Sequence, residues 1–491
     1  MRDHILAIDE GTTGVTALVL DAGRRVVGRA YAELPQSYPR PGWVEQDAAR
    51  MLATVTTVGR DALRAAKMAP SRVAAIGIAN QRETTILWDR KTGTPVAPAI
   101  VWQDKRTATR CEELKTEWER PVRRKTGLVL DPYFSATKLE WLLRDAKRRA
   151  RAKKGELAFG TVDAWLASQL TGRHATDTTN ASRTLLWNIR TGAWDEELLE
   201  LFGVPEGVLP EVRPSSGEVG ITTAFGGTIP VAALVGDQQA ALFGQSCTRP
   251  GESKCTYGTG AFLLQHTGPQ AIASRSGLLT TRAANFDSKP QFALEGAVFT
   301  AGAAIQWLRD QLGFFATSSD INALASEVPD SGGVVVVPAF TGLGAPHWDS
   351  QARGAILGLT RGSDRRHIAR AVLDSIAFQC ADVVAAMEKD SGKRVPRLRV
   401  DGGASQSDLL LQTQADLLQR PVVRPANVET TATGAGFLAG IATGLWGLSD
   451  VRQATQGDVQ LHPKLKAEQA RKKRATWSKA VAVTRSFTPP T

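Results

Sequence analysis

The sequence predicts an α/β fold built from two related domains. Apolar strand-like segments alternate with helical segments along the chain, which is typical of α/β proteins. One arrangement also occurs twice: a strand at residues 5–8 leads through a Gly/Thr-rich turn to a strand at 17–20, and residues 255–264 repeat this hairpin. A chain of 491 residues exceeds what one hydrophobic core usually supports. We therefore expect one domain over residues 1–248 and a second over 249–491.

Strands and helices can be assigned in order through the first half. The apolar run at residues 73–78 is typical of a buried strand, because neither of its faces is polar. Leu139, Leu142 and Leu143 share one face of a predicted helix over residues 137–154. The other expected elements are a strand at 26–33, a helix at 47–67 and a strand at 231–235.

The second half repeats the plan after its hairpin. We expect a helix over 301–312, a strand at 334–337, a long helix over 365–389 and a strand at 398–400. That last strand runs into Asp401-Gly402-Gly403 and a further helix, as the strand at 231–235 runs into Gly236-Asp237. Asp237 and Asp401 are therefore predicted to occupy corresponding places in the two domains.

Composition favours a cytoplasmic globular protein. Hydrophobic residues make up 42% of the chain and charged residues 22%, which is ordinary for a globular protein. No run approaches the roughly 18 apolar residues that span a bilayer, and the start shows no secretory signal. The four cysteines lack metal-ligand spacing, so we expect reduced, mostly buried thiols.

The net charge of +11 raises the question of a nucleic-acid partner. Much of the excess lies in two helical runs, residues 147–154 and 471–474, and neither is interleaved with stacking aromatics. We therefore expect solvated helix faces and no nucleic-acid partner; a weak polyanion patch is the alternative.

The two hairpin turns suit phosphate groups. Backbone amides and hydroxyls of Thr12, Thr13 and Gly14 can surround a phosphate, and Thr259 offers the same groups from the second hairpin. Asp9 suits a magnesium site, since Mg²⁺ is often held by one or two carboxylates together with phosphates. An ordinary hairpin is the alternative for the first turn taken alone. The pair of turns favours a nucleotide held between the domains.

Asp237 ends a predicted strand and is the candidate general base. A carboxylate there can accept the proton of an alcohol placed in line with a terminal phosphate. The alternative is a structural N-cap for a helix that opens at Gln238.

Many sequence blocks, in order, carry a family resemblance that covers residues 5 to about 444. The matching blocks are residues 38–45, 80–85, 131–135, 179–183, 236–244, 338–346, 354–359 and 367–374. The chain resembles the FGGY family of sugar kinases, which implies two ribonuclease-H-like domains of the actin-like ATPase fold around a central cleft. The implied reaction is phosphorylation of glycerol by ATP with Mg²⁺, giving sn-glycerol 3-phosphate; erythritol or xylulose is the alternative acceptor. A homo-oligomer is also possible on this resemblance.

The resemblance also implies roles for individual residues. Because glycerol offers three hydroxyls and little apolar surface, its site must rely on hydrogen bonds. The acceptor would be bound by Arg82, Glu83, Tyr133, Asp237 and Gln238, with Trp102 and Phe262 against its carbon atoms. Without the resemblance, Arg82 and Glu83 would be a surface ion pair and the two aromatics core residues. The nucleotide would be bound by Thr12, Thr13, Gly14, Thr259, Gly302, Gln306, Gly403 and Ser407, and the metal by Asp9.

The chain departs from the family pattern at three places. Glu10 stands where the family usually has Gln, Gly14-Val15-Thr16 replaces a Ser-Ser-Arg run, and Ser407-Asp408 replaces paired Asn residues. The first two changes leave open a catalytically impaired binding protein. A chaperone-type ATPase that shares the fold is a further alternative, because fold does not fix function.

Overall fold

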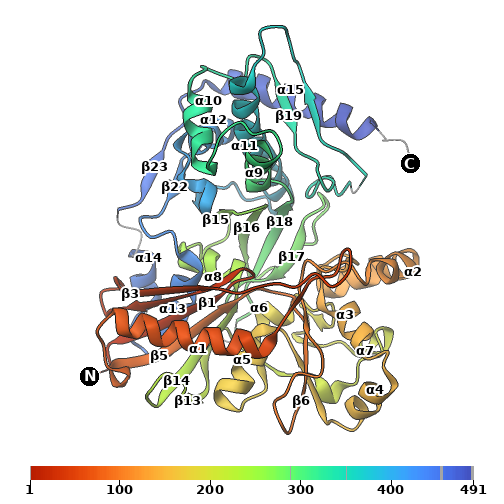
Figure 1. Cartoon of the computed structure of the whole chain (residues 1–491), viewed down its shortest axis with the longest axis vertical. Coiled ribbons are helices and arrows are strands. Elements are labelled where there is room, and N and C mark those ends of the chain that lie inside the picture. Colours follow the sequence, from red (N-terminus) through yellow and green to blue (C-terminus); the bar gives the residue numbers. More distant parts are fainter. Residues whose placement is uncertain (1, 288, 350, 454–456, 488–491) are drawn as a thin grey trace.

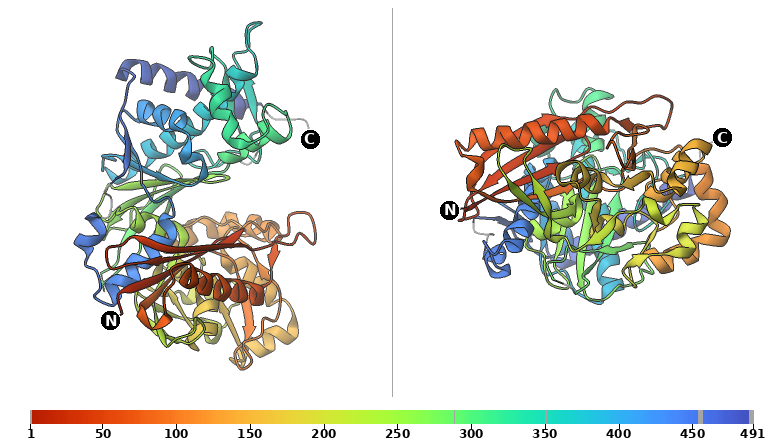
Figure 2. Two further views of the ribbon diagram at one scale, coloured as in Figure 1. Left: turned by 60° about the vertical axis from the view of Figure 1, so that its left-hand side comes forward. Right: turned by 90° about the horizontal axis from the view of Figure 1, so that it is seen from below.

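Two mixed β-sheets organise the molecule, and the α/β prediction is confirmed (Figures 1 and 2). The computed structural model describes residues 2–287, 289–349, 351–453 and 457–487. The first sheet has six strands in the order β13-β14-β5-β1-β2-β3, and the second has seven in the order β17-β18-β16-β15-β21-β22-β23.

The elements of the first half surround the first sheet. Its strands are β1 (His4–Glu10), β2 (Gly14–Leu20), β3 (Val26–Glu33), β4 (Glu45–Gln46), β5 (Val73–Asn80), β6 (Ile86–Asp89), β7 (Ala99–Ile100), β8 (Leu157–Gly160), β9 (Ala175–Asp177), β10 (Trp187–Asn188), β11 (Ala193–Trp194), β12 (Glu211–Arg213), β13 (Ser216–Thr222) and β14 (Ile229–Gly236). Its helices are α1 (Ala48–Ala65), α2 (Ala108–Thr126), α3 (Ser135–Leu142), α4 (Ala146–Lys153), α5 (Val162–Thr171), α6 (Thr178–Ala181), α7 (Glu196–Leu201) and α8 (Asp237–Gly244).

The second half adds the following elements. Its strands are β15 (Ser253–Tyr257), β16 (Ala261–Gly268), β17 (Leu279–Arg282), β18 (Phe292–Val298), β19 (Val335–Val337), β20 (Ala355–Leu357), β21 (Leu398–Asp401), β22 (Val422–Arg424) and β23 (Val459–Leu461). Its helices are α9 (Gly302–Asp310), α10 (Ile321–Ser326), α11 (Arg365–Ser391), α12 (Asp408–Leu418), α13 (Thr430–Ala442), α14 (Leu448–Gln453) and α15 (Ala467–Ser486). Short 3₁₀ turns lie at Pro70–Arg72, Glu206–Val208, Ser318–Asp320 and Gly403–Gln406.

The two sheets share one connectivity. In each, three strands pair antiparallel in a row (β3-β2-β1 and β18-β16-β15), and two more then join in parallel (β5, β14 and β21, β22). The expectation that Asp237 and Asp401 occupy corresponding places in the two domains was wrong. Asp401 ends β21, which lies directly beside β15, so its counterpart is the end of β5 at Asn80. Asp237 follows β14, whose counterpart is β22, and the two aspartates do not correspond.

Helices α8 and α13 lie between the two sheets. Helix α13 belongs to the second half of the sequence, yet it packs against β5 and β1 of the first sheet, while α1 covers the opposite face (Figure 1). The contact between α8 and α13 requires glycine. A Cβ atom added at Gly434 would lie 1.9 Å from the carbonyl oxygen of Ala240, and one at Gly244 would lie 2.1 Å from that of Thr430. The boundary expected at residue 248 stays a prediction.

The single helix expected over residues 137–154 was wrong. The structure has two helices, α3 and α4, and the carboxylate of Asp145 between them accepts the amide of Arg148 at 2.8 Å as the N-cap of α4. The three leucines are buried as expected. All four cysteine thiols are free and buried. In the described part of the chain, no helix is both long and apolar enough to cross a membrane.

Candidate active site

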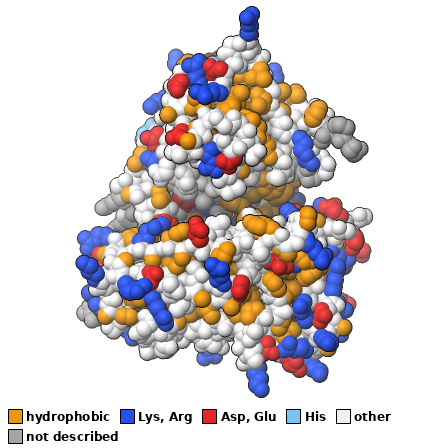
Figure 3. Space-filling view, in the orientation of Figure 1, with side chains coloured by type: hydrophobic (Ala, Val, Ile, Leu, Met, Phe, Trp, Pro, Cys, Tyr) orange, Lys and Arg blue, Asp and Glu red, His pale blue; other side chains and the backbone are white. Residues whose placement is uncertain are grey.

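The two Gly/Thr turns flank the groove between the upper and lower parts of the molecule, which Figure 3 shows from the front. In the first turn, the Gly11 amide bonds the Gly14 carbonyl at 3.0 Å, with Thr12 and Thr13 between them. In the second, the Gly258 amide bonds the Gly260 carbonyl at 2.8 Å, which leaves Thr259 exposed. Both turns therefore present the groups predicted to bind phosphate.

Trp102 connects the two turns. Its Nε1 donates to Thr12 Oγ1 at 2.9 Å, and its ring stands edge-on to Tyr133 at 5.4 Å and to Phe262 at 6.5 Å between centroids. Phe262 lies on β16 directly after the second turn. The structure thus brings together the three aromatic residues expected to border the acceptor.

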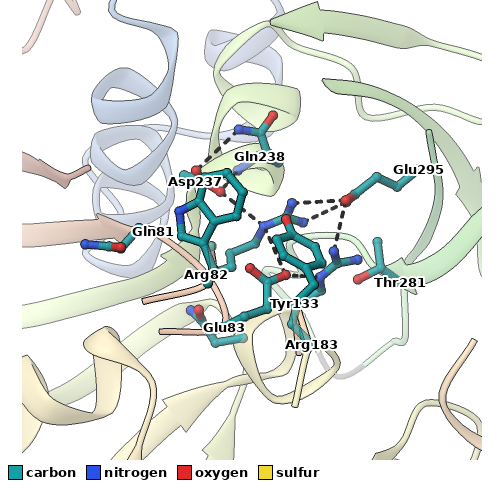
Figure 4. A network of polar contacts seen from close by, with 12 residues as sticks. Gln81, Arg82, Glu83, Tyr133, Arg183, Asp237, Gln238, Thr281 and Glu295 are labelled. Atoms are coloured by element: carbon teal, nitrogen blue, oxygen red, sulfur yellow. Dashed lines mark hydrogen bonds and ion pairs between the residues drawn. The ribbon is translucent and has the colours of Figure 1, made fainter. Parts of the chain in front are cut away.

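Asp237 and Arg82 lie beside Tyr133 (Figure 4). Arg82 Nε is 3.1 Å from Asp237 Oδ1, and the Asp237 side chain is 29% exposed whereas that of Arg82 is 2% exposed. The alternative of Asp237 as the N-cap of a helix that opens at Gln238 was wrong, because α8 begins at Asp237 itself with Gly236 as its N-cap. Asp237 Oδ1 accepts the Gln238 amide at 2.6 Å. The carboxylate therefore satisfies one early helix amide and still reaches solvent.

Arg82 belongs to a buried network of four charged residues, together with Glu83, Arg183 and Glu295. Two nitrogens of Arg82 donate to the carboxylate of Glu295 at 2.7 and 3.0 Å, and Arg183 Nη2 donates to the same carboxylate at 3.0 Å. Arg183 Nε also donates to Glu83 at 2.5 Å. Burial alone would raise the pKa of Glu295, but Arg183 and Arg82 outweigh it and lower that pKa to about 2. All four side chains are at most 2% exposed.

Sequence reasoning gave no role to Arg183 or Glu295. Arg183 lies 100 residues from Glu83, and Glu295 lies 213 residues from Arg82, so no local pattern connects them. The only signal was the position of Arg183 within the matching block at residues 179–183.

Lys254 is a further neighbour that the sequence did not indicate. Its Nζ donates to Gln238 Oε1 and, at 2.8 Å, to Thr256 Oγ1, so it fixes the amide of Gln238. Burial lowers the pKa of Lys254, although the carboxylates of Asp401 and Asp237 act in the opposite direction. A cation from the second sheet therefore lies beside the candidate base.

Asp9 has the features of a metal ligand. Its Oδ1 is buried and accepts no hydrogen bond from the described residues. Burial raises the pKa of Asp9, and the carboxylates of Asp237, Glu429 and Asp401 raise it further, so a cation would be stabilised there. Within the described ranges, no group of three or more His, Cys, Asp or Glu side chains could hold a metal.

Glu10 faces a different set of residues from Asp9. Gln81 Nε2 donates to Glu10 Oε1 at 3.1 Å and to Gln46 Oε1 at 3.0 Å. Burial raises the pKa of Glu10 to about 8, so this carboxyl keeps its proton near neutral pH. A protonated Glu offers one donor and one acceptor, and in this respect it resembles the Gln that the family usually has.

The candidate nucleotide residues fall into two groups. Gly302 opens α9, and its amide donates to the Gly258 carbonyl at 3.0 Å; a Cβ atom there would lie 2.6 Å from that oxygen. Gln306 is exposed on the same helix, and Gly403 is exposed with open space around it. Ser407, in contrast, is buried as the N-cap of α12, and its hydroxyl also bonds Asn322. The Ser407 hydroxyl is thus already used within the protein.

Comparison with known proteins agrees with this geometry. The sequence model for the N-terminal domain of the FGGY family of carbohydrate kinases matches residues 4–244, and the model for the C-terminal domain matches residues 253–443. The chain belongs to the FGGY family of carbohydrate kinases. This FGGY chain is 53% identical over 484 residues to the glycerol kinase of Rhodopirellula baltica, covering 97% of this chain and 90% of that one. It is 51% identical to that of Deinococcus radiodurans, covering 99% and 98%.

The solved structures show the same relationship. The crystal structure of Plasmodium falciparum glycerol kinase with ADP matches this FGGY chain with a TM-score of 0.93 at 34% identity, covering 98% of each chain. The two-domain, actin-like fold that the resemblance implied is therefore confirmed.

Proposed function

We propose that this chain is an ATP-dependent kinase that transfers the γ-phosphate of ATP to glycerol and forms sn-glycerol 3-phosphate. Identity of 51–53% with glycerol kinases over at least 97% of the chain carries the proposal. The contacts around Asp237 and Arg82 support it, because they place a carboxylate and a guanidinium 3.1 Å apart beside the aromatic residues.

The acceptor site suits a small polyol. Arg82 supplies donors and Asp237 an acceptor, while Tyr133 and Gln238 add further polar groups. Such groups select for hydroxyls, because an analogue that lacks one leaves a buried polar group unpaired. The rings of Trp102 and Phe262 cover the carbon atoms of the acceptor. Tyr133 keeps its proton, since burial raises the pKa of its phenol well above the usual value.

Asp237 acts as the general base in this proposal. Its carboxylate accepts the proton of the attacking hydroxyl as that oxygen approaches the γ-phosphate. The Nε edge of Arg82 binds the acceptor next to this attacking hydroxyl. The amides and hydroxyls of Thr12, Thr13 and Thr259 bind the phosphates from the two turns. Mg²⁺, when bound, neutralises charge on the phosphate oxygens, and Asp9 is the residue that would hold it.

A coupled ADP-release assay tests the proposal. Glycerol, erythritol, xylulose, ribulose and gluconate are compared as acceptors with ATP and Mg²⁺, and the Asp237→Asn variant serves as the inactive control. We expect the highest kcat/KM with glycerol. A higher value with erythritol or xylulose would make this a kinase for that acceptor. Turnover with none of the five, together with no thermal shift on adding glycerol, would favour a chaperone-type ATPase or an impaired binding protein.

A further inference from the structure

Glu295 comes from the second sheet but binds residues of the first half of the chain. It lies on β18, opposite Leu264 of β16, and its side chain is fully buried. Its carboxylate accepts three hydrogen bonds, two from Arg82 and one from Arg183. Figure 4 shows Glu295 at one end of this row of side chains and Asp237 at the other, with Arg82 between them.

The Arg82 guanidinium makes polar contacts on two of its edges. Its Nη1 and Nη2 atoms bind Glu295, and Nη1 also donates to Gln239 at 3.2 Å. The Nε atom faces Asp237. Because a guanidinium is planar and rigid, fixing the two Nη atoms also fixes the direction of Nε.

We propose that Glu295 is the positioning residue of the acceptor site: it holds the two Nη atoms of Arg82, so that only the Nε edge faces Asp237 and the polyol hydroxyl. This inference rests on the proposed function, since it concerns the same site. Glu295 acts through Arg82 and makes no contact with the acceptor itself.

The charges around Arg82 show what Glu295 prevents. Glu83 is bound by Arg183, and Arg183 Nη1 already has no partner among the described residues. Without the Glu295 carboxylate, Asp237, already 3.1 Å from Arg82 Nε, is the nearest carboxylate left to Arg82. A buried guanidinium without its carboxylate is strongly destabilised, so the Nη atoms of Arg82 would turn toward Asp237 and engage its second carboxylate oxygen as well. That pair would occupy the oxygen needed by the acceptor hydroxyl.

The alternative role for Glu295 is purely structural, as an ion pair between the two halves. The two roles differ in hydroxyl discrimination, the ratio of kcat/KM for glycerol to that for 1,2-propanediol or 1,3-propanediol, which each lack one hydroxyl. Loss of stability lowers the active fraction equally for all three acceptors and leaves this ratio unchanged. Misplacement of Arg82 lowers the ratio, because Arg82 forms a hydrogen bond with a hydroxyl of the acceptor.

Two variants test the proposal. Glu295→Gln removes the negative charge. Glu295→Asp keeps the charge, but its side chain is shorter by one methylene, so the carboxylate lies farther from Arg82 and Arg183. Gln265→Leu is the matched control, since Gln265 is a buried polar residue on β16 that pairs with Leu294 and bonds the Lys393 carbonyl at 3.3 Å. Melting temperature, ADP affinity and the kinetics of all three acceptors are measured for each protein.

We expect Glu295→Gln to lower hydroxyl discrimination about 10-fold and to raise the KM for glycerol, with ADP affinity unchanged. Glu295→Asp should melt only slightly below wild type and still lose hydroxyl discrimination. The test therefore holds even if Glu295→Gln fails to fold. Gln265→Leu should change only stability. Wild-type discrimination in folded Glu295→Asp overturns the proposal. If wild type turns over another polyol of the acceptor panel and not glycerol, the proposed function is wrong, and the same comparison is made with that polyol and its deoxy analogues.

Discussion

Thr179 Oγ1 accepts the backbone amide of Gly236 at 2.8 Å, and the Thr179 hydroxyl in turn donates to the carboxylate of Asp177 at 2.8 Å. Asp177 is fully buried and also accepts the amide of Asn180 at 2.9 Å and the hydroxyl of Ser215 at 2.6 Å. The residue before Asp237 is therefore fixed by a buried polar network of α6. This network keeps the candidate base at the end of β14 in a defined position.

The Asp237→Asn variant tests the general-base role. Asn keeps the shape and one acceptor oxygen but cannot take the proton, so we expect kcat to fall ~10²–10⁴-fold with little change in melting temperature or nucleotide binding. The Asn side-chain oxygen can accept the Gln238 amide as Asp237 Oδ1 does, so a purely structural role predicts no change in kcat or stability. Both quantities are measured on one preparation. A stable, fully active variant would exclude Asp237 as the base.

The Arg82→Ala variant tests acceptor binding. Loss of a charged hydrogen bond is worth ~1.5–3 kcal/mol, so kcat/KM for glycerol should fall about 10- to 200-fold while nucleotide affinity changes little. The melting temperature should also fall, because Glu295 loses its buried partner. Arg110→Ala is the control, since Arg110 forms a more exposed pair with Glu140. Unchanged glycerol kinetics in Arg82→Ala would remove it from the site.

The Asp9→Asn variant tests the metal role. Removing the charge should weaken the binding of ADP in the presence of Mg²⁺, because only the metal loses a carboxylate ligand. Binding of ADP without Mg²⁺ and binding of glycerol should be nearly unchanged. Calorimetric titrations with and without Mg²⁺ separate these effects. Equal Mg²⁺ enhancement in wild type and variant would rule out Asp9 as the ligand.

Asp163 predicts a pH dependence of stability. Burial raises its pKa to about 7, and the neighbouring Asp177 carboxylate adds to the effect. The unfolded chain loses this proton near pH 4, whereas the folded chain keeps it until about pH 7. This group therefore lowers the free energy of unfolding as the pH rises through that window, by ~1.4 kcal/mol per pH unit.

The Asp163→Asn variant should remove that contribution. We expect its free energy of unfolding to fall less between pH 5 and 7 than that of wild type, measured by urea denaturation at each pH. Asn can still accept a hydrogen bond from Thr161 or Thr176, which both donate to Asp163. Parallel pH profiles for the two proteins would show that Asp163 is ionised in the folded state.

The strands and most helices could be predicted from the sequence because their signals are local. The strand at 26–33 has the predicted bounds, and α1 begins after Asp47, whose side chain accepts two helix amides. The break between α3 and α4 also had a local signal, the N-cap Asp145, which was overlooked because Leu139, Leu142 and Leu143 share one face just before it. Pairing between strands has no such signal. The mistaken match of Asp401 with Asp237 arose because the order of parallel strands depends on how the whole sheet is connected, and not on the local sequence.

The candidate site was predictable in part for the same reason. Asp237 and Arg82 each follow a strand end, and their roles in the site stay predictions. Their surroundings were not predictable, because Glu295 and Lys254 come from another sheet. The alternative of a surface ion pair between Arg82 and Glu83 was wrong. Both side chains are buried, their atoms are 3.9 Å apart, and each residue has a closer partner.

Helix α13 has a consequence for dividing this protein experimentally. A fragment ending at residue 248 would contain every strand of the first sheet but would lack α13, and the apolar side of β1 and β5 that α13 covers would be exposed. Such a fragment would aggregate when expressed alone. Co-expressing residues 1–248 with residues 249–491 would supply the missing helix in trans. The two halves would then reassociate through the glycine contacts of Gly244 and Gly434, as complementing fragments of one folding unit.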